Sequence, residues 1–180
     1  GYFDVFPEKS KTELRTATIL EANPHESLPA GTYVFTEFFC TDPGCNCQRV
    51  LIKALYARSE AARPSEVATI SYSWNPDGDE VWAAVNEGMP NPHLDPLHHQ
   101  APCASELLEF WNIMIERDPA YASRLERHYA EIRAEMARRK GTSARLNVSN
   151  FRTSEGSTYS RDKAEKMARR RRWARARKQK

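Results

Sequence analysis

Three of the chain's four cysteines lie within eight residues, at Cys40, Cys45 and Cys47. Thiolates are preferred ligands of zinc, and a structural zinc site takes about four protein ligands in a tetrahedron. Asp42-Pro43-Gly44 has the composition of a tight turn, which would bring the first two cysteines together. Such crowding is more typical of a metal site in a reducing compartment than of a disulfide framework. The segment therefore predicts part of a metal site.

A fourth ligand is expected from a distant segment, His98-His99-Gln100-Ala101-Pro102-Cys103. Cys103 is the preferred candidate, because it lies where a helix is expected to begin and a helix N-terminus stabilises a thiolate. His99 and His98 are the substitutes. We expect zinc, with iron as the less favoured metal, and inert thiols are the alternative interpretation because the spacing differs from paired Cys-x-x-Cys knuckles.

A catalytic metal would need an open coordination position and a neighbouring acid or base. Side chains of that kind surround the predicted site: Asp42, His93, Asp95, His98 and His99. The sequence nevertheless lacks the His-Glu-x-x-His motif of metalloproteases and the complete motif of zinc deaminases. It also lacks a glycine loop that could bind phosphates. These absences favour a protein that is not an enzyme.

The charge of the chain is divided unevenly. Residues 161–180 contain eleven Lys or Arg and two Asp or Glu, whereas the whole chain has a net charge of +3. A basic tail on an acidic body predicts an anionic partner, with nucleic acid first and an acidic protein or membrane surface second. Arginine pairs with phosphates and stacks on bases, and tryptophan also stacks on bases. The predicted nucleic-acid-binding residues are Arg169, Arg170, Arg171, Arg172, Trp173, Arg175, Arg177 and Lys178.

Hydrophobic patterns indicate the elements that position these residues. Alternation and β-branched content predict strands over 32–40, 49–57 and 67–74, with another at 16–22. The first two of these form a hairpin whose loop carries the cysteines. Helical periodicity predicts helices over 105–117 and from Asp118-Pro119 to about Lys140, packed as an antiparallel pair. Glu37 and His128 are polar exceptions in these patterns, and His128 is interpreted as a structural histidine.

The expected fold is α+β: a small antiparallel sheet with a cysteine-bearing hairpin, packed on the helix pair and followed by a basic tail. We divide the chain into a metal-stabilised domain over 1–140, a Ser/Thr-rich linker over 141–160 and the tail over 161–180. No apolar run approaches the roughly 20 residues of a membrane span. A cytoplasmic protein is therefore expected.

Two resemblances add to these expectations. Phe38–Cys47, Asp118-Pro119-Ala120-Tyr121 and Arg127-His128-Tyr129 together resemble motifs of a group of uncharacterised bacterial proteins, over roughly residues 30–140. That resemblance implies a bacterial, cytoplasmic protein with metal at Cys40, Cys45 and Cys47. Arg169–Trp173 resembles the arginine-rich RNA-binding helices of viral regulatory proteins such as lentiviral Rev, and it implies that the tail can enter an RNA groove.

Together these features predict a zinc-stabilised accessory protein that binds nucleic acid, RNA preferred, through its basic C-terminal arm. A metalloenzyme with a Cys/His site between the 40–47 hairpin and the 93–103 loop is the first alternative. The second is a protein-interaction adaptor whose tail meets an acidic partner.

Overall fold

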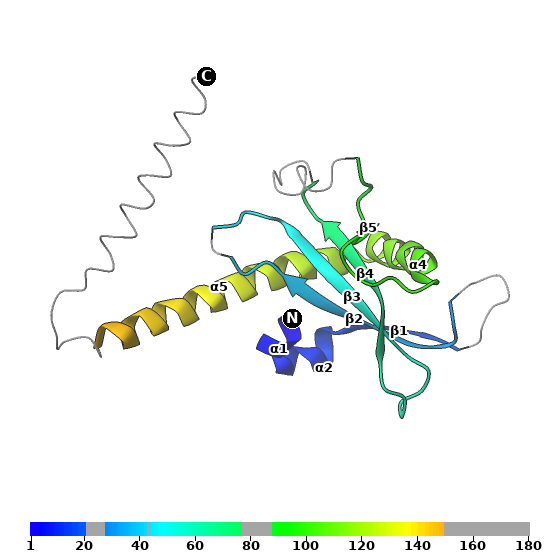
Figure 1. Ribbon diagram of the computed structural model, residues 1–180, viewed down its shortest axis with the longest axis horizontal. Helices are drawn as coiled ribbons and strands as arrows, with labels where there is room; N and C mark the ends of the chain where they lie inside the picture. Colours follow the sequence, from blue (N-terminus) through cyan, green and yellow to red (C-terminus); the bar gives the residue numbers. More distant parts are fainter. Residues whose placement is uncertain (21–27, 43, 77–87, 150–180) are drawn as a thin grey trace, which may run out of the picture. The chain divides into compact units, whose positions relative to one another are not determined.

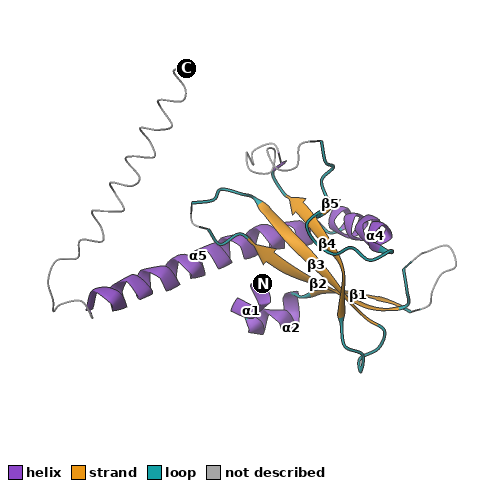
Figure 2. Ribbon diagram, in the orientation of Figure 1, coloured by secondary structure: helices purple, strands orange, loops and turns teal. Residues whose placement is uncertain are grey.

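A single antiparallel sheet organises the structure, with the strand order β1-β2-β3-β4-β5 (Figures 1 and 2). The computed structural model describes residues 1–20, 28–42, 44–76 and 88–149, with side chains through residue 140. The strands are β1 (Arg15–Ile19), β2 (Gly31–Phe39), β3 (Arg49–Ala57), β4 (Ser65–Ser73) and β5 (His93–Leu94). Together with the helices that pack on it, the sheet confirms the predicted α+β class.

The predicted hairpin is present. β2 pairs with β3 along its length, from Thr32 opposite Ala57 to Phe39 opposite Val50. Along β2, buried and half-buried residues alternate, because successive side chains of a strand point to opposite faces. The buried face includes Tyr33 and Phe35.

Two helices pack on that buried face of the sheet, α4 (Ala104–Arg117) and α5 (Pro119–Ser149) (Figure 1). Both present apolar residues at helical spacing, because the side chains that face the sheet recur every three or four positions. The helices meet where the rings of Trp111 and Tyr121 pack edge to face, 6.1 Å between centroids. The buried helix residues are Ala104, Leu107, Trp111 and Ile115 in α4 and Tyr121, Leu125, His128 and Ile132 in α5.

Asp118 begins α5 as the sequence predicts. Its carboxylate accepts a hydrogen bond from the backbone N–H of Tyr121 at 3.2 Å, and Pro119 is the first helical residue. The helix continues to Ser149, beyond the end expected at Lys140. Gly141 thus does not end the helix, although glycine lowers helix propensity.

A short N-terminal segment lies beside β2 and α5. It comprises α1 (Tyr2–Val5), the 3-10 helix η1 (Pro7–Lys9) and α2 (Ser10–Glu13). The sequence showed no clear pattern here, because each helix is a single turn. Tyr2 is fully buried and its ring stacks on that of His128 at 3.8 Å between centroids.

Residues Gly1–Arg139 form one compact unit and Lys140–Lys180 a second. The sheet, the cysteines and the buried residues of α4 and α5 belong to the first unit. The predicted basic tail over 161–180, including Arg169–Trp173, and the linker residues after Ser149 lie outside the described residues.

Candidate metal centre

Cys40, Cys45 and Cys47 come together in the loop between β2 and β3. Their Sγ atoms all lie within 4.8 Å of one another. Cys40 directly follows β2, and Cys47 comes two residues before Arg49, where β3 begins. Because these two strands are paired to their ends, the sheet itself brings the cysteines close.

The loop between the strands is turned by Asp42. Its carboxylate accepts a hydrogen bond from the N–H of Gly44 at 2.9 Å, and its carbonyl oxygen accepts one from the N–H of Cys45 at 3.1 Å. An aspartate that bonds the backbone two residues on makes a tight turn without help from other elements. The turn folds Cys45 back toward Cys40, as the sequence predicted.

Arg133 of α5 supports the loop from outside. Its guanidinium donates hydrogen bonds to the carbonyl oxygens of Cys45, at 2.9 Å, and of Asp42. The same group lies over the ring of Tyr129, 5.5 Å from the centroid. A helix far along the chain therefore fixes the backbone that carries the thiols.

The thiols differ in their electrostatics. A hydrogen bond from the backbone N–H of Cys47, at 3.4 Å, and the nearby charge of Arg49 contribute to a lowered pKa of Cys45. Burial first, and then the neighbouring thiols of Cys45 and Cys40, raise the pKa of Cys47 to about 12. A bound cation reverses this penalty, because a coordinating thiol is deprotonated outright. The arrangement is that of a site which a metal ion would complete.

Cys103 is not part of this group. It is the N-cap of α4, as expected. Burial raises the pKa of Tyr33, and the charge of Cys103 raises it further. Tyr33 lies near the start of β2, whereas Cys40 follows its end. Seven residues of strand span roughly 23 Å. The sequence placed Cys103 correctly at a helix start but could not show which end of the sheet that start would face.

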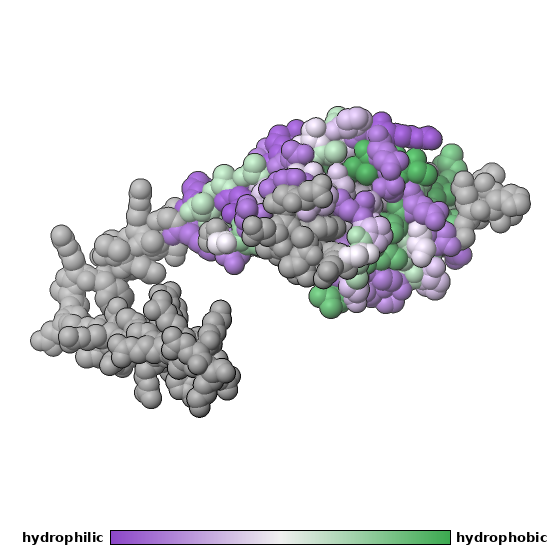
Figure 3. Space-filling view, turned by 90° about the horizontal axis from the view of Figure 1, so that it is seen from above, coloured by the Kyte–Doolittle hydropathy of each residue, from purple (hydrophilic) through white to green (hydrophobic). Residues whose placement is uncertain are grey.

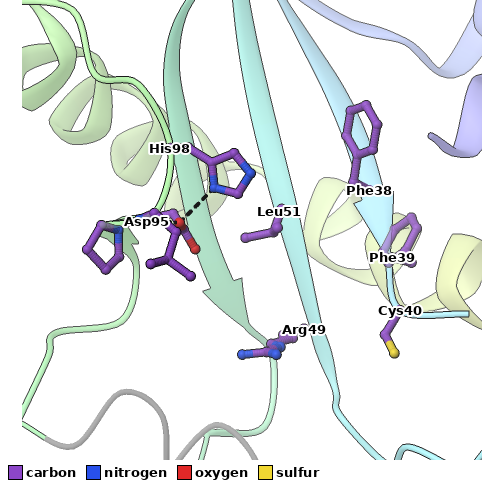
Figure 4. Close-up of a pocket in the computed structure, with 9 residues that line it drawn as sticks. Phe38, Phe39, Cys40, Arg49, Leu51, Asp95 and His98 are labelled. Carbon is purple, nitrogen blue, oxygen red and sulfur yellow. Dashed lines mark hydrogen bonds and ion pairs between the residues drawn. The ribbon is translucent and has the colours of Figure 1, made fainter. Parts of the chain in front are cut away.

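The two substitute ligands also lie outside the cysteine group. Nδ1 of His98 is 2.7 Å from Oδ1 of Asp95, and His99 is exposed. His98 and Cys40 nonetheless line the same groove, on the face of the sheet opposite the helices (Figure 4). In this view Leu51 lies between them, so Asp95 and His98 face Cys40 across β3.

A buried polar cluster beside the centre joins the two exceptions noted in the sequence. Nδ1 of His128 is 2.6 Å from Oε2 of Glu37, and its Nε2 contacts Glu13. Glu37 and His128 are both fully buried. In the sequence, these two residues could be noticed because each is polar among apolar neighbours. Their buried pairing is that of a structural histidine, as expected of His128. Neither Arg133 nor Glu13 carried any signal in the sequence.

The chain matches no protein family model, and neither a curated protein nor a solved structure shows significant similarity to it. Among the described residues, no helix is both long and apolar enough to cross a membrane. Figure 3 shows one face of the molecule, over which hydrophilic residues spread widely and hydrophobic ones form smaller groups. Functional conclusions therefore depend on the chain's own residues.

Proposed function

We propose that this chain is a zinc-binding protein whose metal is held by Cys40, Cys45 and Cys47. The observation that carries the proposal is the convergence of the three Sγ atoms within 4.8 Å. A zinc–sulfur bond of about 2.3 Å places tetrahedral thiolates about 3.8 Å apart, so small side-chain shifts suffice for binding. Zinc is favoured over iron because thiolate sites with tetrahedral geometry are typical of structural zinc.

The first role of the metal is structural. Cys40 and Cys47 flank the ends of two paired strands, and Arg133 joins their loop to α5. Zinc binding to thiolates that fold together contributes directly to folding free energy. The metal would therefore hold the hairpin end against the helix.

Metal content tests this proposal. Full-length protein purified without chelator should contain one zinc per chain by elemental analysis, and C40S, C45S or C47S should each lose most of it. C103S is the matched control, because Cys103 lies at the other end of β2 and outside the cysteine group. Folded protein free of metal would contradict the proposal, and so would equal zinc loss in C103S.

A second candidate function is nucleic-acid binding through the basic arm, with RNA preferred. The supporting observation is the composition of residues 161–180, in which eleven residues are basic and two acidic. Binding that neutralises phosphates releases counterions, so affinity should fall steeply with salt. Arg169–Arg172 and Trp173 are the residues expected to contribute most.

Binding of short RNA and DNA, single- and double-stranded, across a salt series tests the arm. Replacing Arg169–Arg172 by glutamine should weaken binding and flatten the salt dependence, by up to about 0.7 to 0.9 in slope for each phosphate that is no longer neutralised. The matched control replaces the exposed residues Arg58, Arg63, Arg117 and Lys140 by glutamine, which removes the same charge from elsewhere. Equal weakening in both variants would indicate unselective attraction, as expected of an adaptor for acidic partners.

A further inference from the structure

The cysteine group leaves the coordination of the proposed zinc incomplete. Zinc is almost always four-coordinate in proteins, so three protein ligands leave one position for water or another ligand. In the part of the chain that the structure describes, the group of potential ligands contains three residues, Cys40, Cys45 and Cys47. The fourth coordination position is therefore left to a ligand from outside this group.

A groove on the face of the sheet opposite the helices reaches one of the three cysteines, Cys40. Cys40 forms part of its wall, and the groove encloses about 330 Å³ (Figure 4). Phe38 and Leu51, which pair across β2 and β3, provide an apolar surface beside it. Leu97 borders the groove as well and is 88% exposed. Its size suits a small molecule rather than a folded partner.

Arg49 gives the groove a positive charge. It lines the groove at the start of β3. No carboxylate of the described residues lies within ion-pair distance of its guanidinium, whereas the lining carboxylate, Asp95, bonds His98. A guanidinium without a carboxylate partner beside an apolar surface can take a carboxylate from a ligand.

We infer that the fourth coordination position opens into this groove and accepts the sulfur of a small thiol that carries a carboxylate. The inference rests on the proposed zinc site and deepens it. A metal held by thiolates favours a soft donor, which selects sulfur over oxygen. Arg49 then pairs with the carboxylate, and Phe38 and Leu51 contact the carbon chain between the two groups.

Binding exchanges one ligand for another without a redox step. The thiol loses its proton and its sulfur bonds the metal, while the water at that position leaves. The proton passes to solvent, because Leu51 lies between His98 and Cys40 (Figure 4). No electron is transferred, and no further reactant is needed.

Cobalt-substituted full-length protein gives a direct readout, because each thiolate bound to Co(II) adds charge-transfer absorption. The protein is reduced, freed of thiols, loaded with Co(II), and titrated with 3-mercaptopropionate. We expect added sulfur-to-cobalt absorption, with 2-mercaptoethanol binding about tenfold more weakly because it lacks the carboxylate. Propionate, which lacks the thiol, should add no such absorption.

Substitution R49Q should remove the preference for 3-mercaptopropionate over 2-mercaptoethanol, because glutamine cannot pair with the carboxylate. The matched control is R58Q, which removes an exposed arginine just beyond the other end of β3. A cobalt spectrum that no thiol alters would overturn the inference, since a protein ligand then fills the fourth position. A spectrum changed by H98N without added thiol would also overturn it, by identifying His98 as that ligand. Failure to bind cobalt or zinc at all would remove the zinc proposal itself.

Discussion

Arg133 shows how a residue distant in sequence can control the metal centre. Its guanidinium bonds the carbonyl oxygens of Asp42 and Cys45, so the position of the loop depends on a side chain of α5. Groups that orient metal ligands typically affect metal affinity by about 10- to 100-fold when they are replaced. Both bonds come from one nitrogen, Nη1, while the planar guanidinium also lies over the ring of Tyr129.

Substitution R133K should therefore lower zinc affinity by about tenfold while the protein stays folded, because lysine keeps the charge but loses the planar group that lies over Tyr129 and sets the donor position. Competition with a chromophoric chelator measures the change. R138K is the control, since Arg138 lies on the same helix and bonds Glu135 rather than the loop. Unchanged affinity in R133K would show that the turn at Asp42 holds the cysteines unaided.

Single residues also show where sequence reasoning succeeds. The three thiols could be assigned to one site because the turn between Cys40 and Cys45 is local. Glu37 and His128 could be recognised as exceptions, since each interrupts an apolar pattern. Their pairing could not be recognised, because it joins residues 91 positions apart. Cys103 failed to join the site for the same reason: its position depends on tertiary packing.

At the scale of elements, ion pairs and hydrogen bonds join the N-terminal segment to α5, in addition to the buried ring of Tyr2. Lys9 bonds Glu131 at 2.6 Å, and Glu13 contacts both His128 and Arg127. Burial alone would raise the pKa of Glu13, but the hydrogen bonds from His128 and Arg127 lower it overall. The pKa of Glu131 is lowered in the same way, against burial, by Lys9 and Tyr2.

These shifts predict the sign of a pH effect. A carboxylate whose pKa is lower in the folded than in the unfolded protein stabilises the fold above its unfolded value, here 4.5. That contribution is lost as the pH falls through the folded pKa. E13Q should therefore destabilise the protein at pH 7, and the difference from wild type should shrink as the pH falls below 4.5.

Urea unfolding between pH 3 and pH 7 measures this effect. The control is E8Q, because Glu8 is 83% exposed and pairs only with a lysine of its own segment among the described residues. Its stability should follow the wild type within about 0.5 kcal/mol at every pH. Parallel curves for E13Q and wild type across the acid range would show that the cluster does not depend on this carboxylate.

The boundaries of an element are predicted accurately where the sequence signal for them is local. β3 was predicted at its observed bounds, Arg49–Ala57, because its alternation is clear and the cysteine loop precedes it. α1 and α2 were missed, since a single turn has no period to detect. The end of α5 was misplaced because a glycine weakens a helix without breaking it.

For the whole molecule, the α+β class could be predicted because strand and helix periods are separate along the chain. The packing of α4 and α5 on the sheet follows from their apolar stripes. What the sequence could not provide is the placement of the 93–103 loop, whose residues pair with β4 and reach the groove. Its prolines and irregular pattern leave such a loop without a local signal.

The metal should also determine the stability of the compact unit. A ligand that binds the folded state alone stabilises it by about 2.7 kcal/mol at a hundredfold excess over its dissociation constant. Cys40, Cys45 and Cys47 connect β2 and β3 at a loop that α5 supports, so removal of the metal should weaken the unit rather than the loop alone. For a domain of this size, the corresponding decrease in melting temperature is about 5 to 10 °C.

Calorimetry of full-length protein with and without a zinc chelator should show that decrease, and added zinc should restore the original value. C103S should respond like the wild type, because its cysteine group is intact. C47S should melt at the lower temperature under both conditions, since it cannot form the tetrahedral site. A melting temperature indifferent to chelator, in wild-type protein from which the chelator has removed the zinc, would assign the metal to reactivity at the groove instead of to folding.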